Sequence, residues 1–147
     1  MMDRSAEPML GLLLFLPYRA MENRVFAALA EAGYRDITLA QARIVQRIAP
    51  GGIRLTELAE QAQVTKQTAG FLVDQLERAG YVERVPDPTD GRARLVRLSA
   101  RGQQATSVAN AVAAEVENEW ADYLGPRTTE QLRRALTRLR DITDPYR

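Results

Sequence analysis

The stretch Ile53–Gly102 reads IRLTELAEQAQVTKQTAGFLVDQLERAGYVERVPDPTDGRARLVRLSARG and contains the residues that decide the fold. Two short helical patterns joined by a tight turn come first. Two short strand-like runs follow, Tyr81–Val85 and Arg94–Leu98, with a polar loop of Pro, Asp and Gly residues between them. This order of elements predicts a helix-turn-helix followed by a β-hairpin wing, a shape suited to duplex DNA.

The second helix of this stretch carries the clearest helical pattern and is expected from about Lys66 to Ala79. Its apolar residues recur at i, i+3, i+4 and i+7, which places them on one side of the helix: Ala69, Leu72, Val73 and Leu76. Gly80 follows, at the position where glycine commonly ends a helix. Thr56 is expected to cap the shorter helix that precedes the turn.

The segments before this stretch also have helical patterns. The first helix is expected over about Glu7–Ala32. Pro17 should kink or break it, because proline lacks a backbone N–H and clashes with the preceding turn. Thr38 and Gln41 then form the capping-box pattern T-x-x-Q, which predicts a second helix that continues to about Ala49.

After the stretch, Ser99 is expected to cap a long helix that continues to about Leu124, and Gly125-Pro126 separates it from a final helix. Thr128 and Gln131 repeat the capping-box pattern at the start of that last helix. Each helix carries an apolar stripe at helical spacing: Val108, Val112, Val116 and Trp120 in the first, and Leu132, Ala135, Leu136, Leu139 and Ile142 in the second.

Three long amphipathic helices are too many for the small middle part to cover, which predicts a homodimer that buries them together. The expected fold is mainly α with a small β-hairpin wing, a winged helix-turn-helix plus N- and C-terminal dimerisation helices. At 147 residues the chain is long enough for one domain with a core. We therefore expect a single domain over 1–147, with the DNA-binding part at 36–99 and dimerisation helices at 5–33 and 100–147.

Overall charge says little about a partner, because 20 basic residues face 19 acidic ones and the net charge is +1. Any attraction for nucleic acid must therefore be local. Between Gly91 and Arg101 the chain has arginines and no acid: Arg92, Arg94, Arg97 and Arg101. Such a run is typical of a solvated strand face and also of a surface that meets DNA, and the run alone does not separate the two.

Composition excludes several kinds of site. The chain has no cysteine and no histidine, which removes disulfides, zinc sites built from these residues, and Cys–His or Ser–His catalysis. No cofactor or metal is expected. The only obvious acid/base candidates, Glu115, Glu117 and Glu119, stand two residues apart, which scatters them around a helix. We therefore expect no enzyme activity.

The apolar run Met9–Leu16 is too short to span a bilayer, which takes ~20 residues. It also lacks the form of a signal peptide, because Asp3 and Glu7 precede it. A helix buried against a partner explains the run better. The lack of cysteine is compatible with the cytoplasm, and we expect a cytoplasmic protein without membrane contact.

A series of short motifs runs through the opening stretch: Glu57-Leu58-Ala59, Val73-Asp74-Gln75-Leu76, Glu77-Arg78-Ala79-Gly80, Val82-Glu83-Arg84, PDPTDGR from Pro86 to Arg92, and Leu98-Ser99-Ala100-Arg101-Gly102. Together they resemble the winged helix-turn-helix of the MarR family of bacterial transcription regulators. The D-x-R at the wing tip followed by L-[ST]-x-x-G is a specific combination. The order of helices on both sides also fits, so the resemblance covers nearly the whole chain.

This resemblance implies a homodimer with interleaved terminal helices and one wing per subunit. It implies binding to a pseudo-palindromic operator in double-stranded DNA, usually to repress a nearby gene. For many members of the family it also implies release by a small, often aromatic, effector. A repressor is therefore the leading hypothesis, and an activator or dual regulator is not separated from it by sequence.

The chain departs from the family pattern at Gly70 and Phe71, where a polar and then a basic residue are common. Phe71 lies off the apolar stripe of its helix, so two interpretations stay open. It faces a DNA groove and meets a thymine methyl, or it packs against the wing or a neighbouring helix. Gln63 stands where many helix-turn-helix proteins have glycine, which predicts a small backbone strain.

The recognition helix presents its N-terminal residues to base edges, and this geometry nominates DNA contacts at Thr65, Lys66, Gln67, Thr68 and Gly70, with Phe71 as the unusual addition. Gln67 suits adenine, where a bidentate pair contributes ~1–3 kcal/mol of discrimination. Lys66 suits guanine or phosphate. Thr65 also suits simple helix capping, and the two roles are compatible.

Further DNA candidates flank the recognition helix. The family pattern places Arg92 in the minor groove, braced by Asp90, because a narrow groove concentrates negative potential. An ordinary hairpin salt bridge is the alternative for this pair. Arg84 and Arg94 are candidate phosphate contacts. Arg54 and Thr56 are also candidates, at the helix N-terminus where backbone N–H groups favour anions.

Aromatic and basic residues also fall in the segments that would line an effector crevice between the dimer helices and the winged part: Tyr18, Arg19, Tyr34, Trp120 and Tyr123. An arginine beside aromatic rings suits an aromatic carboxylate. Packing in the core or in the dimer interface is the alternative. For the whole chain, the competing function is a winged-helix protein–protein interaction module that does not bind DNA.

Overall fold

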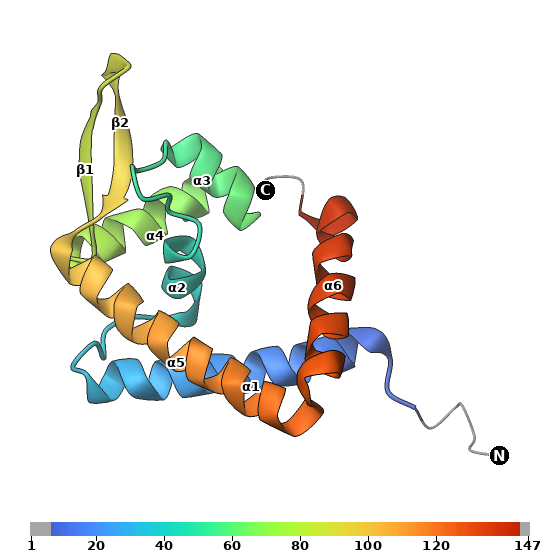
Figure 1. Cartoon of the computed structure of the whole chain (residues 1–147). Helices are drawn as coiled ribbons and strands as arrows, with labels where there is room; N and C mark the ends of the chain where they lie inside the picture. The colour runs from blue at the N-terminus through green and yellow to red at the C-terminus, as the bar shows by residue number, and fades with distance from the viewer. Residues whose placement is uncertain (1–6, 145–147) are drawn as a thin grey trace. The chain divides into compact units, whose positions relative to one another are not determined.

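The computed structural model describes residues 7–144. In chain order its elements are α1 (Leu10–Glu31), α2 (Leu39–Val45), α3 (Leu55–Ala62), α4 (Lys66–Arg78), β1 (Val82–Asp87), β2 (Asp90–Leu98), α5 (Ala100–Leu124) and α6 (Pro126–Thr143) (Figure 1). Helices dominate and one hairpin is the only sheet among the described residues, which confirms the expected mainly α fold with a β-hairpin wing.

The described residues form two compact units, residues 7–33 with 108–144 and residues 34–107, and each unit is described by itself. The second contains α2, α3, α4, the hairpin and the first turns of α5, and we call it the winged unit. The first contains α1, the rest of α5 and α6, and we call it the helical unit. The outermost positions of the expected dimerisation segments, 5–6 and 145–147, lie outside the described residues.

The winged unit is built on the apolar stripe of α4. Ala69, Val73 and Leu76 are fully buried, and Leu72 is nearly so. Burying such a side chain contributes ~1.5–3 kcal/mol, so this stripe holds α2 and α3 against α4. The helix ends where Gly80 takes a φ of 86°, as expected from the sequence.

The turn between α3 and α4 depends on a left-handed residue. Gln63 has φ 58° and ψ 44°, which confirms the expected strain, since a side chain in this region is disfavoured relative to glycine. The Val64 N–H then donates to the Ala59 carbonyl at 3.0 Å. The turn so formed delivers Thr65, the N-cap of α4, whose hydroxyl accepts from the Thr68 N–H at 3.0 Å.

Helix starts match the sequence expectation in two places and differ in two. The capping box of α2 is present, and Ser99 accepts from the Gly102 N–H at 3.1 Å at the start of α5. Thr56, however, is not a cap, because α3 already begins after Arg54. Thr128 is not a cap either, because α6 begins after Gly125 with proline at its first position.

One helix end and one expected break also differ from expectation. α2 ends at Val45, four residues before the expected Ala49, and turns follow it. α1 passes through Pro17 without a break, so the proline is accommodated inside one continuous helix. Proline in a helix interior removes one hydrogen bond, and the helix on either side of it is unbroken.

The hairpin pairs β1 with β2 in antiparallel register, from Val82 opposite Leu98 to Pro86 opposite Arg94, with an irregularity after Pro86. Both strands are longer than the sequence indicated. Ile53, just before α3, adds an isolated bridge to Val96, with N–H to carbonyl distances of 2.9 and 2.8 Å. Figure 1 shows the hairpin as an arm that extends beyond the three short helices of its unit.

Tyr81 joins α4, the wing and α5 inside the winged unit. Its side chain is buried, and its hydroxyl donates to the Asp36 carboxylate at 2.5 Å. The Arg101 guanidinium lies 4.3 Å from the centre of the Tyr81 ring and also bonds the Ala79 carbonyl. Burial, and then the bond to Asp36, raise the pKa of Tyr81 to about 12. The phenol therefore stays neutral and keeps the proton that it donates to Asp36.

The helical unit exposes much of its apolar surface. α6 has no buried residue within the described chain, although its stripe is strongly one-sided: Leu132, Ala135, Leu136, Leu139 and Ile142. α1 likewise exposes large side chains from Leu12 to Leu16. Arg24 and Glu119 form a two-bond ion pair of 2.8 and 3.1 Å between α1 and α5. None of the helices over 7–144 is long and apolar enough to span a membrane.

Candidate nucleic-acid interface

The outward side of α4 carries exposed polar residues. Lys66, Gln67 and Thr68 are exposed, and neither the Lys66 nor the Gln67 side chain has a hydrogen bond or ion pair with other residues in 7–144. Thr65 and Thr68 are tied to each other through their hydroxyls at 2.9 Å, besides the cap itself. Thr65 therefore serves as a helix cap, as one of its two expected roles, while Lys66 and Gln67 are free to meet a ligand.

Phe71 also lies on this outward side, with 61% of its surface exposed. Within residues 7–144 the ring is therefore not buried against the wing or a neighbouring helix. Gly70 beside it is half-buried, and a Cβ added there would meet only Leu55, at an ordinary 3.7 Å. Internal packing thus does not require glycine at this position.

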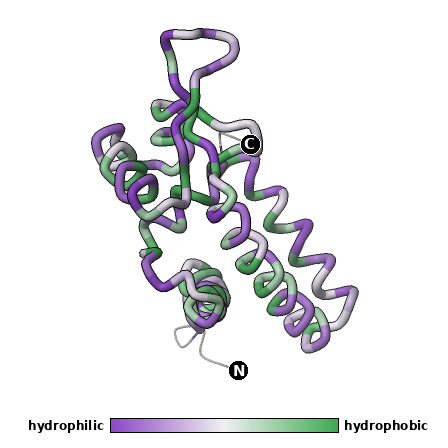
Figure 2. The backbone as a smooth tube through the Cα atoms, turned by 90° about the vertical axis from the view of Figure 1, so that its left-hand side faces the viewer, coloured by the Kyte–Doolittle hydropathy of each residue, from purple (hydrophilic) through white to green (hydrophobic). Residues whose placement is uncertain are grey.

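The wing tip presents Arg92 and Arg94, both exposed and, within residues 7–144, without a side-chain partner. Asp90 does hold Arg92, but through the backbone: its carboxylate accepts the Arg92 N–H at 3.1 Å. The expected guanidinium brace and the alternative hairpin salt bridge are both absent from the described residues. In Figure 2 the tip is coloured as hydrophilic or neutral, in keeping with these solvated side chains.

Asp87 organises the wing turn and is a residue that the sequence did not suggest. One carboxylate oxygen accepts from the Thr89 N–H at 2.8 Å and the Thr89 hydroxyl at 2.7 Å. The other accepts from Arg54 Nε at 2.9 Å and a terminal nitrogen at 2.8 Å. The D-P-T order of a carboxylate two residues before a threonine, an Asx-turn pattern, was the available signal. Arg54 therefore ties the start of α3 to the wing.

These bonds change how the wing responds to acid. The two Thr89 bonds, and then Arg54, lower the pKa of Asp87 from 3.8 to about 2. A carboxyl whose pKa is lowered in the folded state adds stability that is complete above the unfolded value and is lost as pH falls through the folded value. Stabilisation by Asp87 should therefore persist to pH 4 and disappear toward pH 2.

We predict that the stability difference between the wild type and Asp87→Asn is constant above pH 5 and shrinks between pH 4 and pH 2. Urea unfolding at a series of pH values measures it. Asp122→Asn, at an exposed position of α5, is the matched control and should show no such window. A wild-type to Asp87→Asn difference that stays constant down to pH 2 would contradict the assignment.

Arg84 is committed to the recognition helix rather than to solvent. It pairs with Asp74 at 2.8 Å and Glu77 at 2.9 Å, and only 21% of its side chain is exposed. Its single positive charge is therefore shared between the two carboxylates of the second half of α4. Arg94 keeps an exposed side chain, and Thr56 is exposed in the first turn of α3, where backbone N–H groups lack helical partners.

Charge is divided between the two units. Residues 34–107 hold eleven basic and eight acidic side chains, a formal excess of three positive charges. Residues 7–33 and 108–144 hold seven basic and ten acidic side chains, an excess of three negative charges. The small net charge of the chain thus hides a basic winged unit, which favours a polyanionic partner for that unit.

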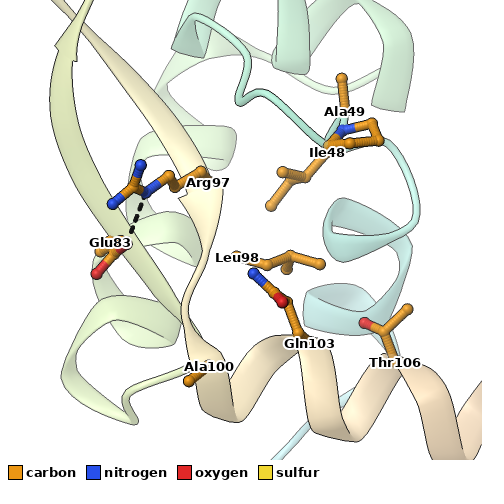
Figure 3. A pocket seen from close by; sticks show the side chains of 9 residues that line it. Ile48, Ala49, Glu83, Arg97, Leu98, Ala100, Gln103 and Thr106 are labelled. Atoms are coloured by element: carbon orange, nitrogen blue, oxygen red, sulfur yellow. Dashed lines mark hydrogen bonds and ion pairs between the residues drawn. The ribbon is translucent and has the colours of Figure 1, made fainter.

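The expected effector residues do not gather at the pocket described within the winged unit. That pocket, of about 690 Å³, lies between the turn that follows α2, the base of the wing and the first turns of α5 (Figure 3). Gln103 and Thr106 line one side, Ile48 and Ala49 the other, and Arg97 pairs with Glu83 at 2.6 Å. None of the five residues nominated from the sequence lines it.

Those five residues have other surroundings. Tyr34 is half-buried, with its ring centre 6.2 Å from that of Tyr81, and Arg19 lies 3.6 Å from Glu22. Tyr123 is 90% exposed and Tyr18 44% exposed, whereas Trp120 is partly covered. Tyr34 belongs to the winged unit and the other four to the helical unit.

The sequence of this chain is similar to those of known transcription regulators. A family model described as the MarR family matches residues 35–93. The transcriptional regulator HosA of Escherichia coli O111:H- is 32% identical over 96 residues, which is 65% of this chain and 71% of HosA. The HTH-type transcriptional repressor Rv2887 of Mycobacterium tuberculosis is 29% identical over 131 residues, 88% of this chain and 92% of the repressor.

The fold comparison agrees. The crystal structure of MarR superposes with a TM-score of 0.70 at 27% identity, covering 92% of this chain and 98% of that one. The match extends well beyond the region of the family model, so the helices on both sides of the winged unit are part of the shared fold.

Proposed function

This chain belongs to the MarR family of transcription regulators and is not an enzyme, and on that premise we propose that it is a homodimeric repressor that binds a pseudo-palindromic operator in double-stranded DNA. The observation that carries the proposal is the set of exposed and unpartnered side chains on α4 and the wing tip, within residues 7–144: Lys66, Gln67, Arg92 and Arg94. We assign the site of action to the cytoplasm, where the DNA is.

The two elements suit different parts of the duplex. A helix fits the major groove, where Gln67 pairs with adenine and Lys66 with guanine or phosphate. The wing is narrow and carries its arginines at the tip, which suits a minor groove. Arg54 and Asp87 fix the wing to α3, so both elements approach DNA as one piece. The positive excess of the winged unit supports attraction to the duplex.

The dimer is proposed from the helical unit. Its exposed apolar stripe on α6 and the run Leu12–Leu16 on α1 are surfaces that soluble monomers rarely leave uncovered. A two-fold pairing of these helices buries them and sets two recognition helices on a palindrome. Sedimentation of the whole chain at micromolar concentration should give twice the 16.4 kDa chain mass.

The deciding experiment is a binding titration with duplex DNA from upstream of the protein's own gene, at several salt concentrations. We expect specific binding whose affinity falls steeply with salt, because phosphate neutralisation releases counterions. Gln67→Ala should lower specific affinity and leave non-specific affinity unchanged, whereas Gln104→Ala, an exposed glutamine on α5, should change neither. Absence of any salt-dependent binding would favour the protein–protein module instead.

Arg84→Ala is expected to weaken operator binding although Arg84 itself faces α4. Without it, Asp74 and Glu77 lose the one positive charge that pairs with them. At ~10 Å from a phosphate in water, one charge contributes roughly 0.4 kcal/mol, so binding should fall about twofold at low salt. Fluorescence anisotropy measures the loss.

The matched background for this test is the double variant Asp74→Asn, Glu77→Gln. In that background Arg84→Ala again removes one positive charge, so the same loss of about twofold is expected, because Coulomb contributions at this distance add. A loss of about tenfold or more in either background would show that Arg84 contacts phosphate directly, as the sequence first suggested.

Release by a small aromatic ligand is the regulatory part of the proposal. Arg19 and Tyr18 on α1 with Trp120 and Tyr123 on α5 provide a cation and rings suited to an aromatic carboxylate. Salicylate and benzoate are simple probes. Either should raise the melting temperature of the free protein and weaken operator binding, and Arg19→Ala should abolish both effects. If neither acid changes stability or affinity, this part of the proposal fails while DNA binding stands.

A further inference from the structure

Phe71 is the one large hydrophobic side chain that is exposed within the described residues 34–107. Every other large apolar residue of the winged unit is at least partly covered. An isolated exposed ring on an otherwise polar surface gains free energy by leaving water only when a partner covers it. The position of this ring on α4 indicates what that partner is.

Helical spacing places Phe71 beside Gln67. The two are four residues apart, one turn along the same side of α4, and the buried stripe with Ala69 and Val73 lies on the opposite side. Gln67 is the residue assigned to a base edge under the proposed function. The ring of Phe71 therefore lies on the same side of α4 as Gln67, one turn further along the helix.

Gly70 supports this placement independently. Glycine in a helix interior costs about 1 kcal/mol relative to alanine. Here a Cβ would meet only Leu55 at 3.7 Å, so the interior of the protein gives no reason for that cost. Omitting a side chain at Gly70 lets the helix backbone come close to an external surface and leaves one flank of the Phe71 ring open.

We propose that Phe71 is a specificity residue that reads the C5-methyl group of a thymine in the major groove. The methyl is the only apolar group that base edges offer there, and cytosine lacks it. The ring has no hydrogen-bonding atom, so it discriminates by burying that methyl. This inference rests on the proposed DNA binding and adds a predicted base preference to it: a thymine near the base read by Gln67.

The test uses duplexes that the wild-type chain selects from a random-sequence pool. Each thymine of the selected half-site is replaced in turn by deoxyuridine, which removes the methyl and keeps every hydrogen bond. We expect one position per half-site at which wild-type binding falls about fourfold, as the loss of one buried methyl predicts. Phe71→Ala should bind the thymine duplex more weakly and lose the difference between thymine and deoxyuridine.

Two further variants sharpen the result. Phe71→Leu keeps an apolar contact and should retain part of the methyl preference, while Gln67→Ala should keep it in full. Gly70→Ala should be as stable as the wild type or more stable, yet bind the selected duplex more weakly because the backbone is held away. All three replace residues that are not fully buried, so folding is not at stake.

The outcomes separate the two claims. If the wild type binds the selected duplex but tolerates deoxyuridine at every position, or if Phe71→Ala still distinguishes the two bases, the inference is wrong and DNA binding stands. If no duplex is selected, the proposed function fails and the inference with it. If Phe71→Ala instead changes only the sedimentation of the free protein, the ring covers a second copy of the chain, which also overturns the inference.

Discussion

Replacing Gly102 by alanine is expected to destabilise the protein by at least about 3 kcal/mol, a large part of the stability of a domain this size. A Cβ at this position would lie 2.0 Å from the Tyr81 carbonyl oxygen and 3.1 Å from its carbon. Neither partner can move freely. The Tyr81 carbonyl accepts the Ser99 N–H at 3.0 Å, and the Tyr81 ring is buried.

The same change elsewhere should have the opposite sign, which makes the test specific. Gly70 is also inside a helix, and Gly70→Ala meets only ordinary contact distances, so it should stabilise by ~0.5–1 kcal/mol. Thermal unfolding of both variants against the wild type measures the contrast. A Gly102→Ala variant as stable as Gly70→Ala would show that Gly102 packs less tightly against the Tyr81 carbonyl than it does in the structure.

The glycine of the L-[ST]-x-x-G motif illustrates what a sequence does reveal. Local patterns were sufficient for the α4 stripe, the α2 capping box and the Ser99 cap, because each depends on residues within one or two turns. The strain at Gln63 was predicted from its place in the helix-turn-helix pattern, where glycine is common, and its backbone is indeed left-handed. The family resemblance, which the comparisons bear out, rests on these same local motifs.

The two misplaced helix starts have different causes, one long-range and one local. Ile53 pairs with Val96, forty-three positions away, and this bridge keeps the chain extended until Arg54, so α3 begins before Thr56 is available as a cap. At α6, Pro126 fixes a helical φ at the first position, and the Thr129 hydroxyl bonds the Gly125 carbonyl. In both places a stronger constraint outweighs the general preference for a threonine cap.

The partners of the charged site residues could not be predicted from the sequence either. Arg54 finds Asp87 across thirty-three positions, and Arg84 finds Asp74 across ten, because folding brings α3, α4 and β1 together. Exposure is easier to predict than pairing, since an outward helix side follows from the buried one. For that reason Lys66 and Gln67 were identified correctly as exposed. The sequence left two interpretations open for Phe71, and Asp87 was missed.

Arg92→Ala is the second variant with a large expected effect: operator binding should weaken by about tenfold or more, with no loss of thermal stability. An arginine in a narrow minor groove gains from the concentrated negative potential there. In the free protein its guanidinium has no partner within residues 7–144, so its removal costs the fold nothing. Anisotropy titrations at one fixed salt concentration and a melting curve measure the two quantities.

Arg97→Ala is the matched control, because it removes an equal charge from the same strand. Arg97 is held by Glu83 at 2.6 Å near the base of the wing, so its loss should lower affinity less than about threefold, as for a general charge effect. Arg92→Lys keeps the charge but not the planar guanidinium and should fall between the two. If Arg92→Ala and Arg97→Ala weaken binding equally, the wing adds only general attraction. A loss confined to Arg92, and largest on duplexes with A·T pairs beside each half-site, places the wing tip in the minor groove.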